Sequence, residues 1–392
     1  MNLGIYVQVP FCQTKCTYCN FHTGAFSASL YSPYAEAVCR EIRGYESLLR
    51  AARVELPSGF ASLVVDTVYL GGGTPSLLDP SALARILDAI RERFRTALVE
   101  VTLEADPETI TPEKAAAWKA AGFTRISLGV QSFDDRELVA AGRMHRRADV
   151  FRASEILRQA GFDNLSFDLI AGLPHQTRAS WEDSLGQLLR LRPDHVSVYL
   201  MEIDEGSRLG REVLAGGKRY SAEALPSDDA MAEFYESACE RLSRAGYEHY
   251  EISNWAIPGR ESRHNLKYWR REPYLGFGAG AHSFSGTERW ANAHEPAAYV
   301  ASLARGEIPV EQLERLSPQQ ALEEEIFLGL RQLKGIDLDH LERQYNPWFR
   351  GDLRRRIAEL ESQGLVLSDG GRIRLAPERL AVSNEVFVAL MD

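Results

Sequence analysis

The sequence predicts an α/β fold: a partial (βα)6 barrel of the TIM type, followed by a small C-terminal domain that resembles a winged helix. Short apolar runs alternate with amphipathic helical stretches over about the first 250 residues, which is typical of βα units. The runs are nearly continuous in apolar character, as expected for parallel strands covered by helices. Polar and glycine-rich segments follow the runs, where parallel α/β folds carry their functional groups.

The predicted elements follow one another in chain order. The segment MNLGIYVQVPFC contains the first apolar run, and helical stretches with one apolar face separate the later runs. Six such units fit a barrel or part-barrel better than a small doubly wound sheet. We predict strands at residues 4–9, 63–70, 99–104, 125–129, 165–170 and 195–200, and helices at residues 34–51, 81–94, 112–121, 150–160 and 180–191.

The segments that follow five of these strands carry the polar residues. PFCQTKCTYC follows the first strand, GGGTP the second, EADPE the third, GVQSF the fourth and DLIAGLP the fifth. Because the carboxyl ends of parallel strands meet at one face of a barrel, we expect these segments to form one site.

The pattern changes after about residue 300, where the βα alternation stops. Amphipathic helices are predicted at 317–334 and 347–363, with a shorter one at 338–344. The stretch GLVLSDGGRIRLAPE then predicts a hairpin, with the turn at Asp369-Gly370-Gly371. We therefore predict a barrel domain at 1–300 and a C-terminal helical, winged-helix-like domain at 301–392.

Composition and charge narrow the class of protein. The 392 residues are 45% hydrophobic and carry a formal net charge of −10, which disfavours general attraction to nucleic acid. No apolar run approaches the ~20 residues of a membrane span, and the first residues lack the pattern of a signal peptide. Three of the five cysteines lie within eight residues, unlike a disulfide framework. These features predict a cytoplasmic location.

Cys12, Cys16 and Cys19 form a CxxxCxxC motif on the loop after the first strand. Closely spaced thiolates on a loop can hold three irons of a [4Fe–4S] cluster. Three ligands leave the fourth iron open to the amino and carboxylate groups of S-adenosylmethionine (SAM), whose cleavage then releases a 5′-deoxyadenosyl radical. The alternative is a structural zinc site with His22 as fourth ligand, although this spacing is unusual for zinc.

These motifs resemble a known family. CxxxCxxC directly after a first strand, with an aromatic residue before the last cysteine, is similar to the radical SAM superfamily. YVQVPFCQTKCTYCNF and VYLGGGTPSLL resemble the branch that contains oxygen-independent coproporphyrinogen III dehydrogenase and the HemW-type heme chaperones. The resemblance covers essentially the whole chain and implies a [4Fe–4S] cluster and SAM as cofactors.

The resemblance also implies which residues bind SAM. The glycine segment after the second strand corresponds to the family segment that holds the amino end of SAM, and its backbone N–H groups suit a charged ligand. Arg143 is expected to pair with the methionyl carboxylate. Taken singly, each residue is better explained by an ordinary buried hydrogen bond or a core aromatic, and it is their co-occurrence in register that supports a SAM site. The predicted SAM residues are Tyr6, Gly72, Gly73, Thr74, Glu104, Gln131, Arg143, Asp168 and Tyr199.

A second motif, HNxxYW at 264–269, resembles the heme-binding signature of the HemW type. It implies His264 as an axial heme ligand, with Tyr268 and Trp269 packed against the porphyrin. The structural alternative is a basic loop around a hydrogen-bonded histidine. Among the other histidines, His282 is the one we expect nearest to this site. The basic residues predicted to pair with heme propionates are Arg260, Arg263, Lys267, Arg270 and Arg271.

Two features separate the functions within this branch. The dehydrogenases carry a further cysteine two residues after the third, where this chain has Phe21, and their N-terminal extension is missing here. We therefore predict a heme chaperone, with coproporphyrinogen III decarboxylation as the alternative and nucleic-acid regulation as the weakest one. The resemblance implies hemoprotein acceptors, among them respiratory membrane enzymes reached by peripheral membrane contact, and an electron donor.

Overall fold

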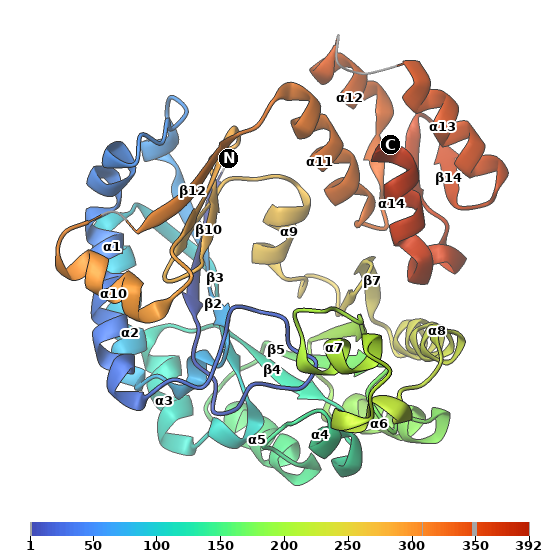
Figure 1. The fold of residues 1–392 in the computed structure, drawn as a ribbon, viewed down its shortest axis with the longest axis horizontal. Helices are drawn as coiled ribbons and strands as arrows, with labels where there is room; N and C mark the ends of the chain where they lie inside the picture. The colour runs from blue at the N-terminus through green and yellow to red at the C-terminus, as the bar shows by residue number, and fades with distance from the viewer. Residues whose placement is uncertain (1, 308, 347–350, 392) are drawn as a thin grey trace.

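The predicted α/β fold is confirmed by the computed structural model, which describes residues 2–307, 309–346 and 351–391. A 12-stranded sheet has the order β12-β11-β10-β9-β1-β2-β3-β4-β5-β6-β8-β7 and curves around the centre of the molecule (Figure 1). Its central strands β1 to β6 pair in parallel, as predicted. They are β1 (Asn2–Val9), β2 (Val64–Gly72), β3 (Thr96–Ala105), β4 (Arg125–Gln131), β5 (Leu165–Ala171) and β6 (His195–Leu200).

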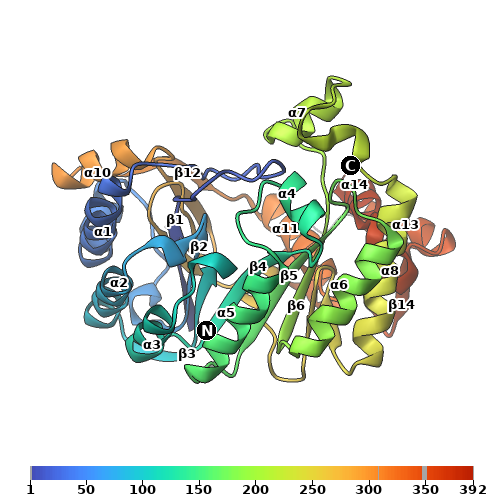
Figure 2. The same cartoon turned by 90° about the horizontal axis from the view of Figure 1, so that it is seen from below.

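Helices cover the outer face of this sheet (Figure 2). Several begin with the caps that their sequences predict: Asp79 accepts from the Ser81 N–H and Thr111 from the Lys114 N–H, each followed by proline. Two short helices, α4 (Asp135–Ala140) and α7 (Arg208–Leu214), lie beyond the carboxyl ends of the strands. The covering helices are α1 (Tyr31–Ala51), α2 (Pro80–Arg93), α3 (Pro112–Ala121), α5 (Arg147–Gln159), α6 (Arg178–Leu191) and α8 (Asp228–Arg244).

The two faces of the sheet differ in polarity. Successive side chains of a strand point to opposite faces. In β1, Ile5, Val7 and Val9 are fully buried and pack in the core under the helices. The alternate residues point to the inner face, where Tyr6 pairs in register with Tyr69. The inner face, which we call the lumen, is lined by polar side chains: Thr67, Glu100, Thr102, Arg125, Ser127, Ser166, Asp168, His195 and Ser197.

Short strands extend the sheet at both edges, and the sequence pattern did not predict them. β9 (Tyr274–Phe277), β10 (His282–Phe284), β11 (Glu288–Asn292) and β12 (Val310–Arg315) continue from β1. β8 (Asn254–Ala256) and β7 (Glu248–Glu251) continue from β6. Runs of three to six residues give too little periodicity to be recognised.

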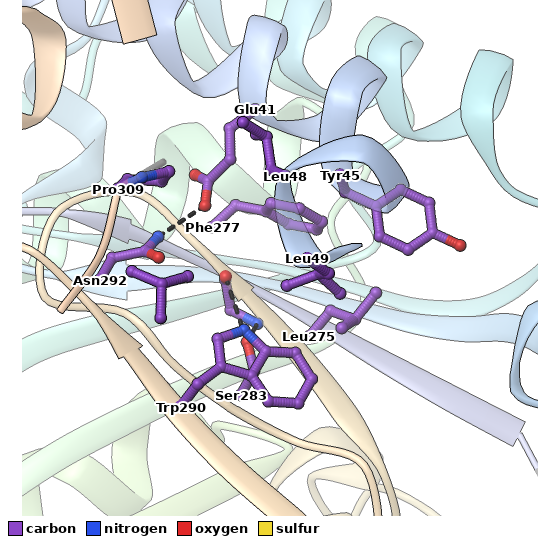
Figure 3. Close-up of a pocket in the computed structure, with 12 residues that line it drawn as sticks. Glu41, Tyr45, Leu48, Leu49, Leu275, Phe277, Ser283, Trp290, Asn292 and Pro309 are labelled. Carbon is purple, nitrogen blue, oxygen red and sulfur yellow. Dashed lines mark hydrogen bonds between the residues drawn. The ribbon is translucent and has the colours of Figure 1, made fainter. Parts of the chain in front are cut away.

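A buried carboxylate joins α1 to the first extension, beside a small apolar pocket (Figure 3). Glu41 accepts hydrogen bonds from the Gly278 N–H at 2.8 Å, Asn292 Nδ2 at 2.6 Å and the Tyr299 hydroxyl at 2.5 Å. Burial raises the pKa of Glu41 to about 7. Tyr299 belongs to α10 (Pro296–Ala304). This one side chain therefore fixes three separate segments.

The C-terminal region forms a separate small unit with a three-stranded sheet of order β13-β15-β14. The predicted helices and hairpin are present, except that 347–350 lie outside the described residues. The unit docks on the β7 edge, where the Ile252 N–H donates to Arg331 O at 3.0 Å. Its elements are α11 (Pro318–Leu330), β13 (Ile336–Asp337), α12 (Leu338–Tyr345), α13 (Gly351–Ser362), β14 (Val366–Asp369), β15 (Arg372–Leu375) and α14 (Ser383–Met391).

Within the described ranges, no helix has both the length and the apolar character that crossing a bilayer requires.

Candidate functional site

The three-cysteine loop, residues 12–24, leaves the carboxyl end of β1 and is tied to the strand end by its backbone. The Cys12 N–H donates to Gly24 O at 2.9 Å and the Gly24 N–H to Pro10 O at 3.0 Å. Further along, the Thr17 N–H donates to Ala141 O at 3.0 Å, and Thr17 O accepts from the Leu209 N–H at 2.8 Å. The loop is thus held between the ends of α4 and α7.

The three thiols are free and half-buried. Arg143 Nη1 lies 3.5 Å from Cys16 Sγ, and Cys19 Sγ lies 3.7 Å from the Thr23 hydroxyl. Burial, assisted by nearby Asp106, Cys16 and Cys19, raises the pKa of Cys12 to about 11 although Thr23 lowers it. Without a cation the Cys12 thiol therefore stays protonated, and a bound metal would deprotonate it.

The zinc alternative required His22 to join the cysteines. In the structure the His22 ring instead packs on His294, with ring centroids 4.2 Å apart. Among the described residues, no group of three or more His, Cys, Asp or Glu side chains is arranged to hold a single metal ion. The loop supplies three free thiols, which are the ligand type that [4Fe–4S] clusters use.

The glycine segment lies against the three-cysteine loop. A Cβ atom at Gly73 would lie 2.6 Å from Phe11 O and 3.0 Å from Cys12 Sγ. Gly72 has φ +112°, and a Cβ there would lie 2.4 Å from Gln8 Nε2. The Thr74 N–H donates to Phe11 O at 2.6 Å. Only glycine permits this close approach of strands β1 and β2 at the site.

Glu104, at the end of β3, reaches across to the glycine segment. Its Oε2 accepts from the Gly72 N–H at 2.9 Å, and its Oε1 accepts from the Tyr69 hydroxyl at 2.7 Å. Burial, together with nearby Asp168 and Asp106, raises the pKa of Glu104 to about 7, while the bonds from Tyr69 and Gly72 oppose this rise. A carboxyl group with this pKa can accept from a ribose hydroxyl or pair with an ammonium group.

Arg143 connects the thiols to the sheet. Its Nη2 donates to Asp106 and, at 2.8 Å, to Gly129 O, while Thr74 Oγ1 donates to Asp106 Oδ2 at 2.9 Å. A Cβ at Gly129 would lie 3.0 Å from Gln131 Nε2 and 3.1 Å from Arg143 Nη2, so Gly129 lets these groups converge. Gln131 has φ +63° at an irregularity in the β4–β5 register. Such bulges are typical beside functional sites.

The remaining predicted residues line the same part of the lumen. Asp168 Oδ2 accepts from the Ser127 hydroxyl at 3.2 Å, and burial raises its pKa. Tyr199 is 43% exposed at the end of β6. Tyr6 donates to Gln8 Oε1 at 2.6 Å and stacks on Tyr69, with centroids 6.1 Å apart. Together with the glycine segment, Glu104, Gln131 and Arg143, these side chains border one polar region.

Two observations are compatible with a cluster and SAM at these residues. The Arg143 Nε atom is buried and has no hydrogen-bond partner among the described residues, which suits an anionic ligand. The backbone at Gly73 leaves no room for a Cβ beside Cys12, so the glycine segment lies directly against the thiol loop. Sequence patterns singled out neither Tyr69, Gln8 nor Asp106 as site residues. Of these, only Asp106 had a signal, the polar EADPE segment after β3.

The HNxxYW motif forms α9 (Arg263–Trp269), which lies in the lumen at the amino ends of the strands (Figure 1). Glu100 caps this helix by accepting from the Arg263 and His264 N–H groups, each at 3.0 Å. A Cβ at Gly4 would lie 3.2 Å from the His264 ring and 3.0 Å from Lys267. The helix therefore packs directly on the inner face of β1.

His264 does not fit an open heme ligand in this structure. Its side chain has no exposed surface. Its Nδ1 pairs with the Thr67 hydroxyl at 3.0 Å, and its Nε2 pairs with the Tyr268 hydroxyl at 2.9 Å. Burial, with Lys267 nearby, lowers the pKa of His264 to about 3. The predicted i, i+4 contact between His264 and Tyr268 is present, but it occupies the nitrogen that would bind iron.

Two of the basic residues around HNxxYW already have carboxylate partners in the fold. Lys267 is buried and pairs with Asp66 at 2.9 Å and Glu272 at 3.2 Å. Arg271 pairs with Glu324 of the C-terminal unit at 3.1 Å. Two of the five predicted cations thus serve as links within the fold.

Comparisons with known proteins agree with this geometry. The model of the Radical SAM superfamily matches residues 6–188, and that of the HemN C-terminal domain matches residues 316–378. The chain is 32% identical to the heme chaperone HemW of Bacillus subtilis over 98% of each chain. It is 37% identical to HemW of Mycobacterium tuberculosis, over 94% of this chain and 92% of the relative.

Among solved structures, the radical SAM enzyme coproporphyrinogen III oxidase (HemN) from Escherichia coli superposes with a TM-score of 0.82 at 24% identity. The superposition covers 99% of this chain and 90% of HemN. At this identity the likeness establishes the fold and leaves the reaction to be argued from the site.

Proposed function

The chain belongs to the radical SAM family of HemW heme chaperones, and from this premise we propose that it binds heme and delivers it to acceptor hemoproteins, using a [4Fe–4S] cluster and SAM. The observation that carries the cofactor part is the contact between the glycine cradle and the thiol loop, with Gly73 against Cys12 Sγ. The names of the curated relatives support the chaperone part.

Each group has a role in this proposal. Cys12, Cys16 and Cys19 are the cluster ligands, and Arg143 holds the methionyl carboxylate beside Cys16. Gly72 and Gly73 admit the amino end of SAM. Glu104, Gln131, Asp168, Thr74, Tyr6 and Tyr199 orient the rest of the molecule. The cluster, when bound, supplies the electron for reductive cleavage of SAM.

The alternative is oxidative decarboxylation of coproporphyrinogen III. Phe21 takes the place of the additional cysteine of the dehydrogenases, and its side chain is 66% exposed. This replacement argues against decarboxylation, and none of the described site residues favours that reaction over heme transfer, so we keep it as the competing outcome of the test.

The test is anaerobic incubation of the cluster-reconstituted chain with SAM, a reductant and coproporphyrinogen III, beside a heme titration of the same preparation. We expect one heme per chain, its transfer to an apo-hemoprotein, and no protoporphyrinogen IX. Several turnovers of protoporphyrinogen IX would make the chain a dehydrogenase. A chain that carries the cluster but does not bind heme would overturn the chaperone proposal.

A further inference from the structure

Three histidines outside the site described above lie together at the edge of the barrel mouth. His22 is on the three-cysteine loop, His282 begins β10, and His294 follows β11. The His22 and His294 rings are tilted by 34° with centroids 4.2 Å apart. The Gly280 N–H donates to Ala293 O at 2.8 Å, so the segments bearing His282 and His294 are joined.

This histidine cluster, His22, His282 and His294, has the properties of a ligand site. His22 and His282 are exposed, unlike His264. Burial, then His294 and Lys15, lower the pKa of His22; burial, then His294, Arg289 and His22, lower that of His282. Both rings therefore stay neutral near pH 7, which leaves a lone pair free to bind metal.

His294 carries an unexplained polar atom. Its Nδ1 is buried without a hydrogen-bond partner among the described residues. The backbone approaches this atom closely, since a Cβ at Gly280 would lie 3.0 Å from it. A buried and unpaired ring nitrogen is uncommon in native proteins, and a bound ligand is one explanation for it.

The arrangement of the histidine cluster indicates which class of ligand it can bind. The cluster is not arranged to hold a bare metal ion, as noted for the described residues. Heme iron is different, because the porphyrin fills four positions and only one or two come from protein. Phe21, adjacent in sequence, offers an exposed aromatic face, and Lys15 Nζ lies 3.0 Å from Phe21 O. An aromatic face and a cation match a macrocycle with propionates.

We propose that the histidine cluster is the heme site of this protein, with His22 as an axial ligand of the iron, His294 as the residue that positions the His22 ring, and Lys15 beside a propionate. This inference rests on the proposed function, since it names where the heme of the chaperone binds. It places heme next to the cluster cysteines rather than under α9.

The experiment is a titration of the full-length, cluster-reconstituted chain with ferric heme, followed by absorption and electron paramagnetic resonance spectra. Wild type is compared with His22→Gly, His294→Ala and, as the control, His340→Ala, because His340 is exposed on α12 in the C-terminal unit. We expect His22→Gly to lower heme affinity by about tenfold or more and to lose the histidine-ligated spectrum. His340→Ala should behave as wild type.

Added imidazole should restore the ligated spectrum of His22→Gly, which separates lost ligation from a disturbed loop, and iron and sulfide analysis checks the cluster. An unchanged affinity and spectrum in a His22, His282 and His294 triple alanine variant would overturn the inference and leave the chaperone function intact. Failure of wild type itself to bind heme would instead overturn the proposed function.

Discussion

At the scale of single residues, a sequence motif could predict which side chains serve as ligands. It could not predict whether a side chain is accessible, because accessibility depends on burial in the fold. CxxxCxxC specifies three thiols on one loop whatever surrounds them. The HNxxYW motif gives no such information about His264, because the same sequence fits an accessible heme ligand and a buried core residue. Its full burial comes from Thr67 and Gly4 on strands more than 190 residues away, a contact that only the fold reveals.

The first prediction at the residue scale concerns the three thiols. Cys12→Ser should abolish cluster assembly, because serine is a poor ligand for iron and Cys12 lies against the glycine cradle. Iron and sulfide content and the visible absorption of the reconstituted protein measure this. Cys239→Ser is the matched control, since Cys239 lies on α8 away from the loop and should leave the cluster unchanged. A full cluster in the Cys12 variant would refute the ligand assignment.

The cradle gives a second prediction at this scale. In Gly73→Ala the new methyl group would lie 2.6 Å from Phe11 O and 3.0 Å from Cys12 Sγ, so β1 and β2 must separate where they hold the loop. We expect at least a tenfold weaker affinity for SAM in isothermal titration. Gly44→Ala is the control, because its Cβ meets Leu48 only at 3.8 Å inside α1. Equal affinities for SAM would contradict the cradle.

At the scale of elements, long βα units were predictable and short antiparallel strands were not. Each of β1 to β6 has six to ten residues and a strong apolar outer face. β9, β10 and β11 are each five residues or shorter and owe their position to pairing with β1 and with one another. Glu41 anchors these strands to α1 through hydrogen bonds. The sequence did not predict this contact, because a single side chain produces no periodic pattern.

Glu41 makes this anchor dependent on pH. Its pKa is raised by burial to about 7 from an ordinary 4.5, so the folded state binds more protons than the unfolded state between these values. The contribution of Glu41 to the free energy of unfolding is therefore largest below pH 4.5. It falls by roughly 2–3 kcal/mol as the pH rises to 7. Glu104 contributes in the same direction.

Urea unfolding from pH 5 to 8 measures the effect. Glu41→Gln should flatten the decline that wild type shows, because the amide does not titrate. Glu307→Gln is the control: Arg305 lowers the pKa of Glu307, which therefore titrates below this range. A Glu41 variant that keeps the full wild-type slope would show that Glu41 is ionised in the folded protein throughout.

At the scale of the whole molecule, ion pairs and backbone hydrogen bonds together hold the C-terminal unit to the barrel. Glu324 of α11 accepts from Arg271 at 3.1 Å and from Arg289 at 2.6 Å. The side chain of Arg271 is only 9% exposed, so removal of its partner leaves a nearly buried charge, with Glu325 at 3.9 Å as the other carboxylate that the described residues place beside it. The sequence predicted this unit from its helices and hairpin but not its attachment, because the partners are far apart in the chain.

Glu324→Ala should therefore destabilise the protein by about 2 kcal/mol and loosen the unit. Urea unfolding and hydrogen exchange of α11 and α12 measure the two effects. Glu307→Ala removes an exposed ion pair with Arg305 and should cost far less stability, because solvent screens such a pair. Equal losses in the two variants would show that the Glu324 contacts do not hold the unit in place.

The position of α9 affects the route by which small molecules reach the site. This helix packs on Gly4 of β1, Thr67 of β2 and Glu100 of β3, on the inner face near the amino ends of these strands. We therefore expect a small molecule that binds against Glu104 to reach it from the opposite side, where the three-cysteine loop lies. If heme binds at His22, as we propose, it lies on this side of the molecule, and we expect bound heme to slow the exchange of SAM.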